Sequence, residues 1–211
     1  MPDLLPDAAE VAAIVLAAGA SRRFGADKLL HPLTLQGVTL PLAAHSLLPW
    51  LETFTHITVV VKPAAEIFCR TLETALGTSN AAKIRWLVCT DADKGLASSL
   101  ICGVQANALA AGWLIGLADM PAVPDVAIAG VHNALLNDAE LAAPFNNGRR
   151  GHPVGFNASY LNELLVLRGD TGAKKLLERD QNKIVHIAIE NTGILTDIDT
   201  AADLHAFVSP P

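Results

Sequence analysis

The stretch VAAIVLAAGASRRFGADKLL (residues 11–30) starts as an apolar run, passes through a glycine and then becomes basic. Its first part, Val11–Ala17, predicts a strand that is buried on both faces of a sheet. Gly19 follows where such a strand turns toward a helix, and backbone N–H groups in a turn of this kind can bind oxyanions. The stretch therefore predicts a strand followed by an anion-binding loop.

Apolar runs alternate with amphipathic segments along most of the chain. We expect strands at Val11–Ala17, Ile57–Lys62, Lys83–Cys89, Trp113–Asp119 and Lys183–Glu190. We expect helices at Leu40–Leu51, Ala64–Leu76, Leu96–Ala111, Pro124–Leu136, Ser159–Leu167, Gly172–Arg179 and Thr200–Phe207. This order is typical of βαβ units with a mostly parallel sheet, so chemistry belongs in the loops after the carboxyl ends of the strands.

Composition narrows the class of protein. The chain has 211 residues with no repeat or linker, so we expect a single domain over residues 1–211. The formal net charge of −6 argues against nucleic acid or an anionic membrane as a partner. Three widely spaced cysteines predict neither a zinc site nor a disulfide framework. The acidic N-terminus does not resemble a signal peptide, and we expect a cytoplasmic protein.

The loop after Gly19 is basic but matches neither common phosphate-binding glycine motif. GxGxxG needs a second glycine that is absent here, and five residues separate Gly19 from Gly25 where a Walker A loop has four. Ser21 can donate a hydrogen bond, Arg23 can bind phosphate oxygens in pairs, and Lys28 offers a point charge. These groups suit a nucleoside triphosphate; the alternative is a basic surface loop.

Two later segments offer carboxylates for a metal ion. LADMP places Asp119 at the end of an apolar strand, where it suits Mg²⁺, although it could instead cap the next turn. TDIDT offers Asp197 and Asp199, either of which could complete the site. The alternative there is that Asp199 or Thr200 caps the final helix.

Two further motifs could hold a second anionic substrate. GHPVGF supplies His152, which follows Arg149, Arg150 and Gly151, although a surface turn is the favoured interpretation of this run by itself. GDTGAKKLL (residues 169–177) indicates a helix start, with an anion site at that start as the second interpretation.

The order of these motifs identifies a resemblance. LAAGASRRFGADK, KGLASSL, LADMP, GHPVGF, GDTGAK and DIDTAADL together resemble the molybdenum cofactor nucleotidyltransferases over roughly residues 13–204. Within that family the chain looks most like the cytidylyltransferases, which use CTP. The resemblance implies a Rossmann-like, three-layer α/β sandwich of the nucleotide-diphospho-sugar transferase type. It also implies CTP in the N-terminal half and molybdopterin in the C-terminal half.

The resemblance assigns roles to individual positions. Catalysis and triphosphate binding would fall to Arg23, Lys28 and Asp119, with Asp119 and Asp199 holding Mg²⁺, or Mn²⁺ as the alternative. The nucleotide would contact Leu16, Ala17, Ala18, Gly19, Ser21, Arg23 and Lys28, with Gly95 and Ser98 near its base. The pterin would lie near His152, Pro153 and Asp170. A molybdenum hydroxylase or its chaperone is the implied protein partner.

Position 18 carries the choice of base. Relatives that use GTP resemble this motif but have LAGG, whereas this chain has Ala18 before Gly19. The extra methyl group leaves less room beside the base and favours a pyrimidine. Two other functions are compatible with the motifs: nucleotidyl transfer to a sugar phosphate or other small phosphate, and a chaperone that binds the cofactor for a molybdenum hydroxylase.

Overall fold

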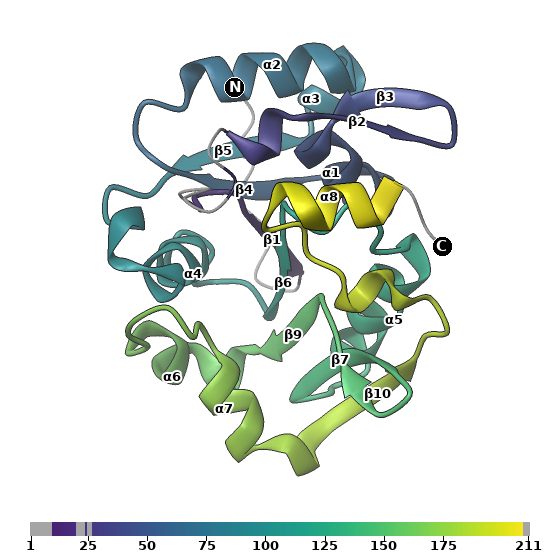
Figure 1. Ribbon diagram of the computed structural model, residues 1–211. Coiled ribbons are helices and arrows are strands. Elements are labelled where there is room, and N and C mark those ends of the chain that lie inside the picture. Colours follow the sequence, from purple (N-terminus) through teal and green to yellow (C-terminus); the bar gives the residue numbers. More distant parts are fainter. Residues whose placement is uncertain (1–9, 20–23, 25–26, 209–211) are drawn as a thin grey trace.

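The computed structural model of the chain describes residues 10–19, 24 and 27–208. An eight-stranded sheet runs through these residues in the order β10-β7-β9-β6-β1-β4-β5, with β8 paired to β7 (Figure 1). Its strands are β1 (Val11–Leu16), β4 (Ile57–Val61), β5 (Ile84–Val88), β6 (Gly112–Leu117), β7 (Leu141–Asn146), β8 (Arg149–Arg150), β9 (Val154–Asn157) and β10 (Ile184–Ala188).

Most neighbouring strands are parallel, as the alternating pattern predicts. β1 pairs in parallel with β4 and β6, β4 pairs with β5, and β10 pairs with β7. β9 runs antiparallel to both β6 and β7, and β8 runs antiparallel to β7. The carboxyl ends of β1 and β6 therefore meet at one edge of the sheet, where Gly19 follows β1.

Helices cover both faces of the sheet. They are α1 (Leu42–Thr53), α2 (Glu66–Leu76), α3 (Thr78–Ala81), α4 (Leu96–Gln105), α5 (Asp125–Leu136), α6 (Leu161–Leu165), α7 (Lys174–Arg179) and α8 (Ala201–Val208). Short 3₁₀ helices are η1 (Lys28–Leu30), η2 (Ala92–Lys94), η3 (Ala158–Tyr160), η4 (Gln181–Lys183) and η5 (Thr192–Leu195). The layers of helix, sheet and helix are seen in Figure 1.

Successive residues of β1 face two separate hydrophobic cores, because side chains alternate across a strand. Val11, Ala13 and Val15 pack with α1, α2 and α5 on one face. Ala12 and Ile14 pack with α4, α6 and α7 on the other. A continuous apolar run is therefore what this central strand requires, and it confirms the predicted α/β sandwich.

A hairpin of β2 (Pro32–Leu35) and β3 (Val38–Pro41) precedes α1 and was not anticipated from the sequence. Its two-residue turn has positive φ at both Gln36 (50°) and Gly37 (82°), the backbone of a type I′ turn. Gln-Gly is a weaker signal for this turn than Asn-Gly. The helix expected from Leu40 consequently starts at Leu42.

Helix α4 is shorter than its apolar pattern predicts. It ends at Gln105 rather than Ala111. The Asn107 side-chain nitrogen donates to the Gly103 carbonyl at 2.7 Å, and the Asn107 carbonyl accepts from Trp113 Nε1 at 2.9 Å. Side-chain bonds of this kind compete with helical backbone bonds, so the chain leaves the helix here.

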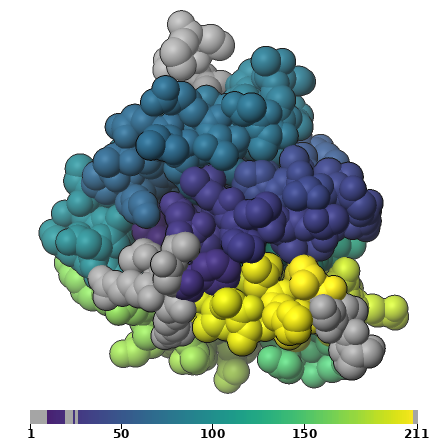
Figure 2. Space-filling view, turned by 45° about the horizontal axis from the view of Figure 1, so that its top comes forward, coloured from purple at the N-terminus to yellow at the C-terminus, as the bar shows by residue number. Residues whose placement is uncertain are grey.

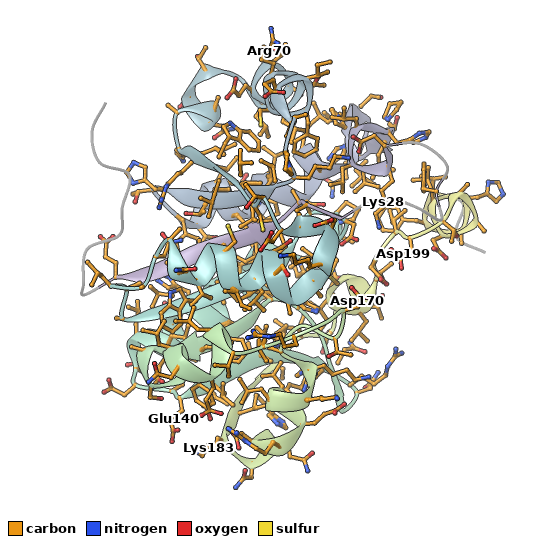
Figure 3. The ribbon with its side chains drawn as sticks, turned by 90° about the vertical axis from the view of Figure 1, so that its left-hand side faces the viewer. Lys28, Arg70, Glu140, Asp170, Lys183 and Asp199 are labelled. Atoms are coloured by element: carbon orange, nitrogen blue, oxygen red, sulfur yellow. The ribbon has the colours of Figure 1, made fainter. Side chains whose placement is uncertain are left out.

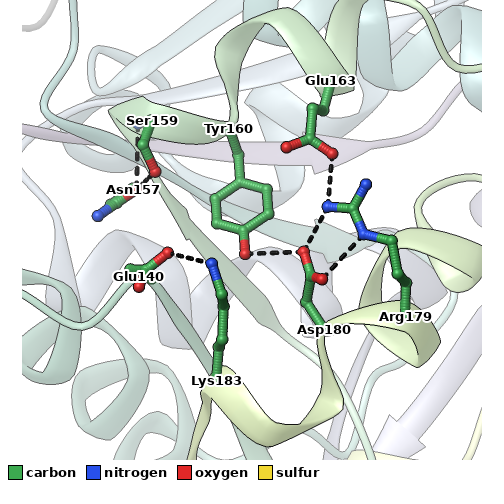
Figure 4. Close-up of polar contacts among 8 residues, drawn as sticks. All are labelled: Glu140, Asn157, Ser159, Tyr160, Glu163, Arg179, Asp180 and Lys183. Atoms are coloured by element: carbon green, nitrogen blue, oxygen red, sulfur yellow. Dashed lines mark hydrogen bonds and ion pairs between the residues drawn. The ribbon is translucent and has the colours of Figure 1, made fainter.

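Polar contacts connect the segment around α7 to Tyr160 of η3 and to Glu140, just before β7 (Figure 4). The Tyr160 hydroxyl donates to Asp180 at 2.9 Å, and Arg179 forms an ion pair with the same carboxylate. Lys183 pairs with Glu140 at 2.9 Å, at the end of the molecule away from Lys28 (Figure 3). No helix among the described residues is long and apolar enough to cross a membrane.

Candidate functional site

A cavity of about 610 Å³ opens at the carboxyl ends of β1 and β6. It receives side chains and backbone from segments that are far apart in the sequence. Its lining consists of Leu16, Ala17, Ala18, Gly19, Lys28, Leu29, Ala92, Asp93, Lys94, Gly95, Leu96, Ser99, Leu117, Asp119, Asp170, Asp197 and Asp199. This is the edge of a parallel sheet where ligands are expected to bind.

Lys28 joins two carboxylates inside the cavity. Its Nζ donates to Asp119 Oδ2 at 2.8 Å and to Asp199 Oδ1 at 2.7 Å. The partners are 91 and 171 positions away in the chain. Lys28 and Asp199 lie on the same side of the molecule as Asp170 (Figure 3).

The backbone brings the two acidic segments together. Ala118 N donates to Leu16 O at 3.0 Å, which continues the pairing of β1 and β6 past the end of the strand. The Asp119 carbonyl then accepts from Ile198 N at 3.0 Å. The C-terminal segment (yellow) consequently lies against the N-terminal segment (purple), as Figure 2 shows.

Burial and ion pairing act against each other on the two main charges of this site, Lys28 and Asp119. Burial raises the pKa of Asp119, and the Lys28 ammonium partly offsets this effect. Burial lowers the pKa of Lys28, but Asp119 and Asp199 outweigh it and leave that pKa above its ordinary value. Lys28 is therefore ionised and is held by the carboxylates of Asp119 and Asp199 in a partly desolvated pocket.

One oxygen of the site has no hydrogen-bond partner among the described residues. Asp119 Oδ1 is buried and receives no donor, although Oδ2 of the same carboxylate binds Lys28. A buried carboxylate oxygen without a donor is costly, and a cation is the ligand that would compensate it. No set of three or more His, Cys, Asp or Glu side chains in the described ranges forms a ready-made metal site. Mg²⁺ needs only one or two protein carboxylates beside its phosphate ligands.

Thr200 caps helix α8, so Asp199 does not. Thr200 Oγ1 accepts from Asp203 N at 3.1 Å, and the Asp203 carboxylate accepts from Thr200 N at 2.7 Å. This reciprocal pair is a capping box. Asp203 also accepts from Asp199 N at 3.1 Å, which fixes the backbone while the Asp199 side chain reaches Lys28.

Two predicted motifs meet at Gly95. Gly95 has φ of 114°, and a Cβ there would lie 2.9 Å from the Gly169 carbonyl and collide with the Asp170 side chain. Ala97 N donates to the same Gly169 carbonyl at 3.0 Å. Only glycine allows this close approach, which brings Asp170 to the wall of the cavity.

Residues 13–184 match the MobA-like NTP transferase domain. The chain belongs to this family. It is accordingly a nucleotidyltransferase with a MobA-like domain. No curated protein sequence matches the chain.

Solved structures share the fold of this MobA-like domain at low sequence identity. Rv0371c of Mycobacterium tuberculosis, solved in complex with manganese, has a TM-score of 0.72 and 20% identity, covering 96% of this chain and all of that one. A 4-diphosphocytidyl-2C-methyl-D-erythritol synthase from Anaerococcus prevotii has a TM-score of 0.70 and 14% identity, covering 95% and 96%. Molybdopterin-guanine dinucleotide biosynthesis protein A from Archaeoglobus fulgidus has a TM-score of 0.63 and 15% identity, covering 92% and 95%.

The MobA-like domain brings most of the predicted site residues, including Asp170 from the predicted pterin site, to one cavity. Those on its wall are Leu16, Ala17, Ala18, Gly19, Lys28, Gly95, Asp119, Asp170 and Asp199. Asp197 lies on the wall as well, so the structure leaves both aspartates of TDIDT beside Asp119. Ser21 and Arg23 lie outside the described residues.

Ser98 does not line this cavity, whereas Ser99 does. Ser98 faces a neighbouring cavity beside β5, together with Cys89 and Arg168. Ser99 is buried and lies one helical turn after Leu96, which also lines the cavity at the carboxyl ends of β1 and β6. The spacing of three residues on α4 was the signal that would have identified Ser99.

His152 and Pro153 are not among the lining residues of the cavity. His152 N donates to Ile194 O at 2.9 Å, and its ring nitrogen Nδ1 is buried without a partner among the described residues. Burial, together with Arg150, lowers the pKa of His152 to about 4. The imidazole is therefore neutral at physiological pH, and it is not on the wall of the cavity.

Proposed function

We propose that this nucleotidyltransferase transfers CMP from CTP to the terminal phosphate of molybdopterin, forming the cytosine dinucleotide of the molybdenum cofactor. A phosphate oxygen of the pterin would attack the α-phosphorus of CTP in line. The bond from the α-phosphorus to the bridging oxygen would break, and pyrophosphate would leave. The observation that carries the proposal is the convergence of Lys28, Asp119 and Asp199 in a cavity walled by the LAAG backbone.

The residues of this site suit positioning and charge neutralisation, because the reaction needs no covalent protein intermediate. Asp119 and Asp199 would hold Mg²⁺, or Mn²⁺, since the Asp119 oxygen that has no partner among the described residues fits a divalent cation. The bound ion would neutralise charge that develops on the leaving pyrophosphate. Lys28 would bind the triphosphate, and we propose the same for Ser21 and Arg23.

The choice of cytosine rests on Ala18. Ala17 and Ala18 are buried and lie on the cavity wall directly before Gly19. A methyl group at position 18 reduces the space beside the base, which disfavours a purine. Ala18 is therefore the residue that we expect to select CTP over GTP.

The second substrate would occupy the C-terminal side of the cavity. Asp170 is on the cavity wall, and we propose that it contacts the pterin, with His152 and Pro153 near the pterin but outside the wall. The sheet runs from β1 to β10 without interruption, which supports residues 1–211 acting as a single domain. We also propose that the enzyme works in the cytoplasm and delivers its product to a molybdenum hydroxylase or to the chaperone of one.

A substrate panel tests this function. The purified protein is incubated with Mg²⁺, molybdopterin cofactor and each nucleoside triphosphate in turn, and products are identified by mass spectrometry alongside pyrophosphate release. The expected result is a cytosine dinucleotide formed with CTP. Comparable turnover of CTP and GTP would contradict the role of Ala18.

The same panel separates the alternatives. A CDP-linked product formed from a sugar phosphate, with none from molybdopterin, would identify a different acceptor. Binding of the cofactor without pyrophosphate release under all conditions would identify a carrier rather than an enzyme of this reaction.

A further inference from the structure

The ammonium group of Lys28 is a counter-ion shared by two carboxylates, those of Asp119 and Asp199. Its side chain is 7% exposed, compared with 22% for Asp119 and 40% for Asp199. Lysine is rarely buried to this extent unless it is paired. Both distances, 2.8 and 2.7 Å, are those of charge-assisted hydrogen bonds.

The same two carboxylates are those proposed to hold the divalent cation. Mg²⁺ binds carboxylate oxygens at about 2.0–2.1 Å, so an ion that bridged both oxygens would compete with the ammonium for the same space. Repulsion between the two positive charges adds to that conflict at short range. The lysine and the metal ion therefore cannot serve both carboxylates at once in this arrangement.

We propose that Lys28 is the resident counter-ion of Asp119 and Asp199 and must leave them before a divalent cation can bind both. The inference rests on the proposed function only for the identity of the metal-binding residues. A triphosphate offers Lys28 another anionic partner, so nucleotide binding releases the carboxylates. Nucleotide and metal ion thereby favour each other's binding, and neither is held tightly alone.

Lys94 provides a matched control for the loss of positive charge. It lines the same cavity, but its ammonium pairs with Asp91 at 2.9 Å and its side chain is 65% exposed. A general electrostatic effect would follow removal of either lysine. If Lys28 competes directly with the metal ion for Asp119 and Asp199, only the removal of Lys28 strengthens metal binding.

The test is the affinity for Mn²⁺ without nucleotide, measured from the electron paramagnetic resonance signal of the free ion. Since Lys28→Met removes the cation that competes with the metal ion for Asp119 and Asp199, it should bind Mn²⁺ at least about tenfold more tightly than wild type. Lys94→Met should match wild type, and Lys28→Arg should show no gain. Adding Asp119→Asn to Lys28→Met should abolish the gain. Equal or weaker binding by folded Lys28→Met would overturn the proposal.

A second measurement uses the wild-type chain, so it holds even if Lys28→Met does not fold. Lys28 is acetylated with an amine-reactive reagent, and the extent of acetylation is measured by mass spectrometry. In the wild-type chain, adding Mn²⁺ should increase this extent. In Asp119→Asn, adding Mn²⁺ should not increase it. No increase at any Mn²⁺ concentration would refute displacement of Lys28. Neither readout involves CTP or pterin, so failure of the proposed reaction would leave this result standing, and the reverse also holds.

Discussion

At the scale of single residues, the two oxygens of Asp119 are used differently. Oδ2 accepts from Lys28 at 2.8 Å, whereas Oδ1 is buried without a partner among the described residues. The backbone of the same residue is anchored by Ile198 at 3.0 Å. The carboxylate is thus held rigidly and left able to accept a cation, which is the arrangement that preorganised catalysis requires.

Replacing Asp119 by Asn should abolish nucleotidyl transfer and leave the fold intact. The amide keeps the shape of the side chain but lacks the charge that a divalent cation needs, so we expect turnover to fall at least about a hundredfold. The measurement is pyrophosphate release under saturating substrates, with circular dichroism to check folding. Asp125→Asn, on the first turn of α5, is the control and should keep wild-type turnover. Near-normal activity of Asp119→Asn would remove this residue from the metal site.

At the scale of elements, helix α8 positions a site residue through its cap. Thr200 and Asp203 satisfy each other's backbone N–H groups, and Asp203 also accepts from Asp199 N. The cap therefore fixes the position of the Asp199 backbone, from which the side chain reaches Lys28. A surface helix far from β1 in sequence contributes in this way to the geometry of the cavity.

Thr200→Ala should weaken both stability and activity. Loss of the capping hydroxyl should lower the free energy of unfolding by about 1 kcal/mol, measured by urea denaturation. Turnover should fall as well, because Asp199 is less firmly placed. Thr74→Ala removes a threonine hydroxyl that donates to the Arg70 carbonyl within α2, and it should change neither property appreciably. Unchanged stability in Thr200→Ala would show that the capping box is dispensable.

At the scale of the whole molecule, the packing of helix α1 on the sheet depends on a glycine in β6 that lies opposite a tryptophan in α1. Gly116 on β6 faces Trp50 of α1, and a Cβ at position 116 would overlap the indole ring. Trp50 is 2% exposed and belongs to the core under α1, α2 and α5. The absence of a side chain at Gly116 thus lets the largest side chain of α1 lie against the centre of the sheet.

Gly116→Ala should destabilise the protein by about 1–3 kcal/mol, because the extra methyl group forces the tryptophan out of its packed position. Equilibrium denaturation measures the loss. Combining the change with Trp50→Leu should cost less than the sum of the two single variants, since the clash disappears with the ring. Strict additivity would contradict direct contact as the cause.

Much of this architecture was predictable from local pattern. Buried apolar runs mark strands wherever helices cover both faces of the sheet, and β1, β4 and β6 follow that rule. The β2–β3 hairpin was not predicted because its turn needs a positive φ at Gln36, and glutamine is not a residue type that indicates such a backbone. The resemblance assigns Ser98 to the base, whereas Ser99 lines the cavity. Neighbouring positions on a helix differ in direction by about 100°, and only the packed helix shows which one faces the cavity.

The sequence by itself determined the α/β class, the order of most elements and a set of acidic and basic residues after strand ends. It did so because strand and helix periodicity and turn chemistry are local properties. Only the tertiary structure decided that Lys28 bridges Asp119 and Asp199, that Thr200 rather than Asp199 caps α8, and that Asp170 meets Gly95. These contacts join separate segments, and their geometry depends on how β1, β6 and the C-terminal segment pack together.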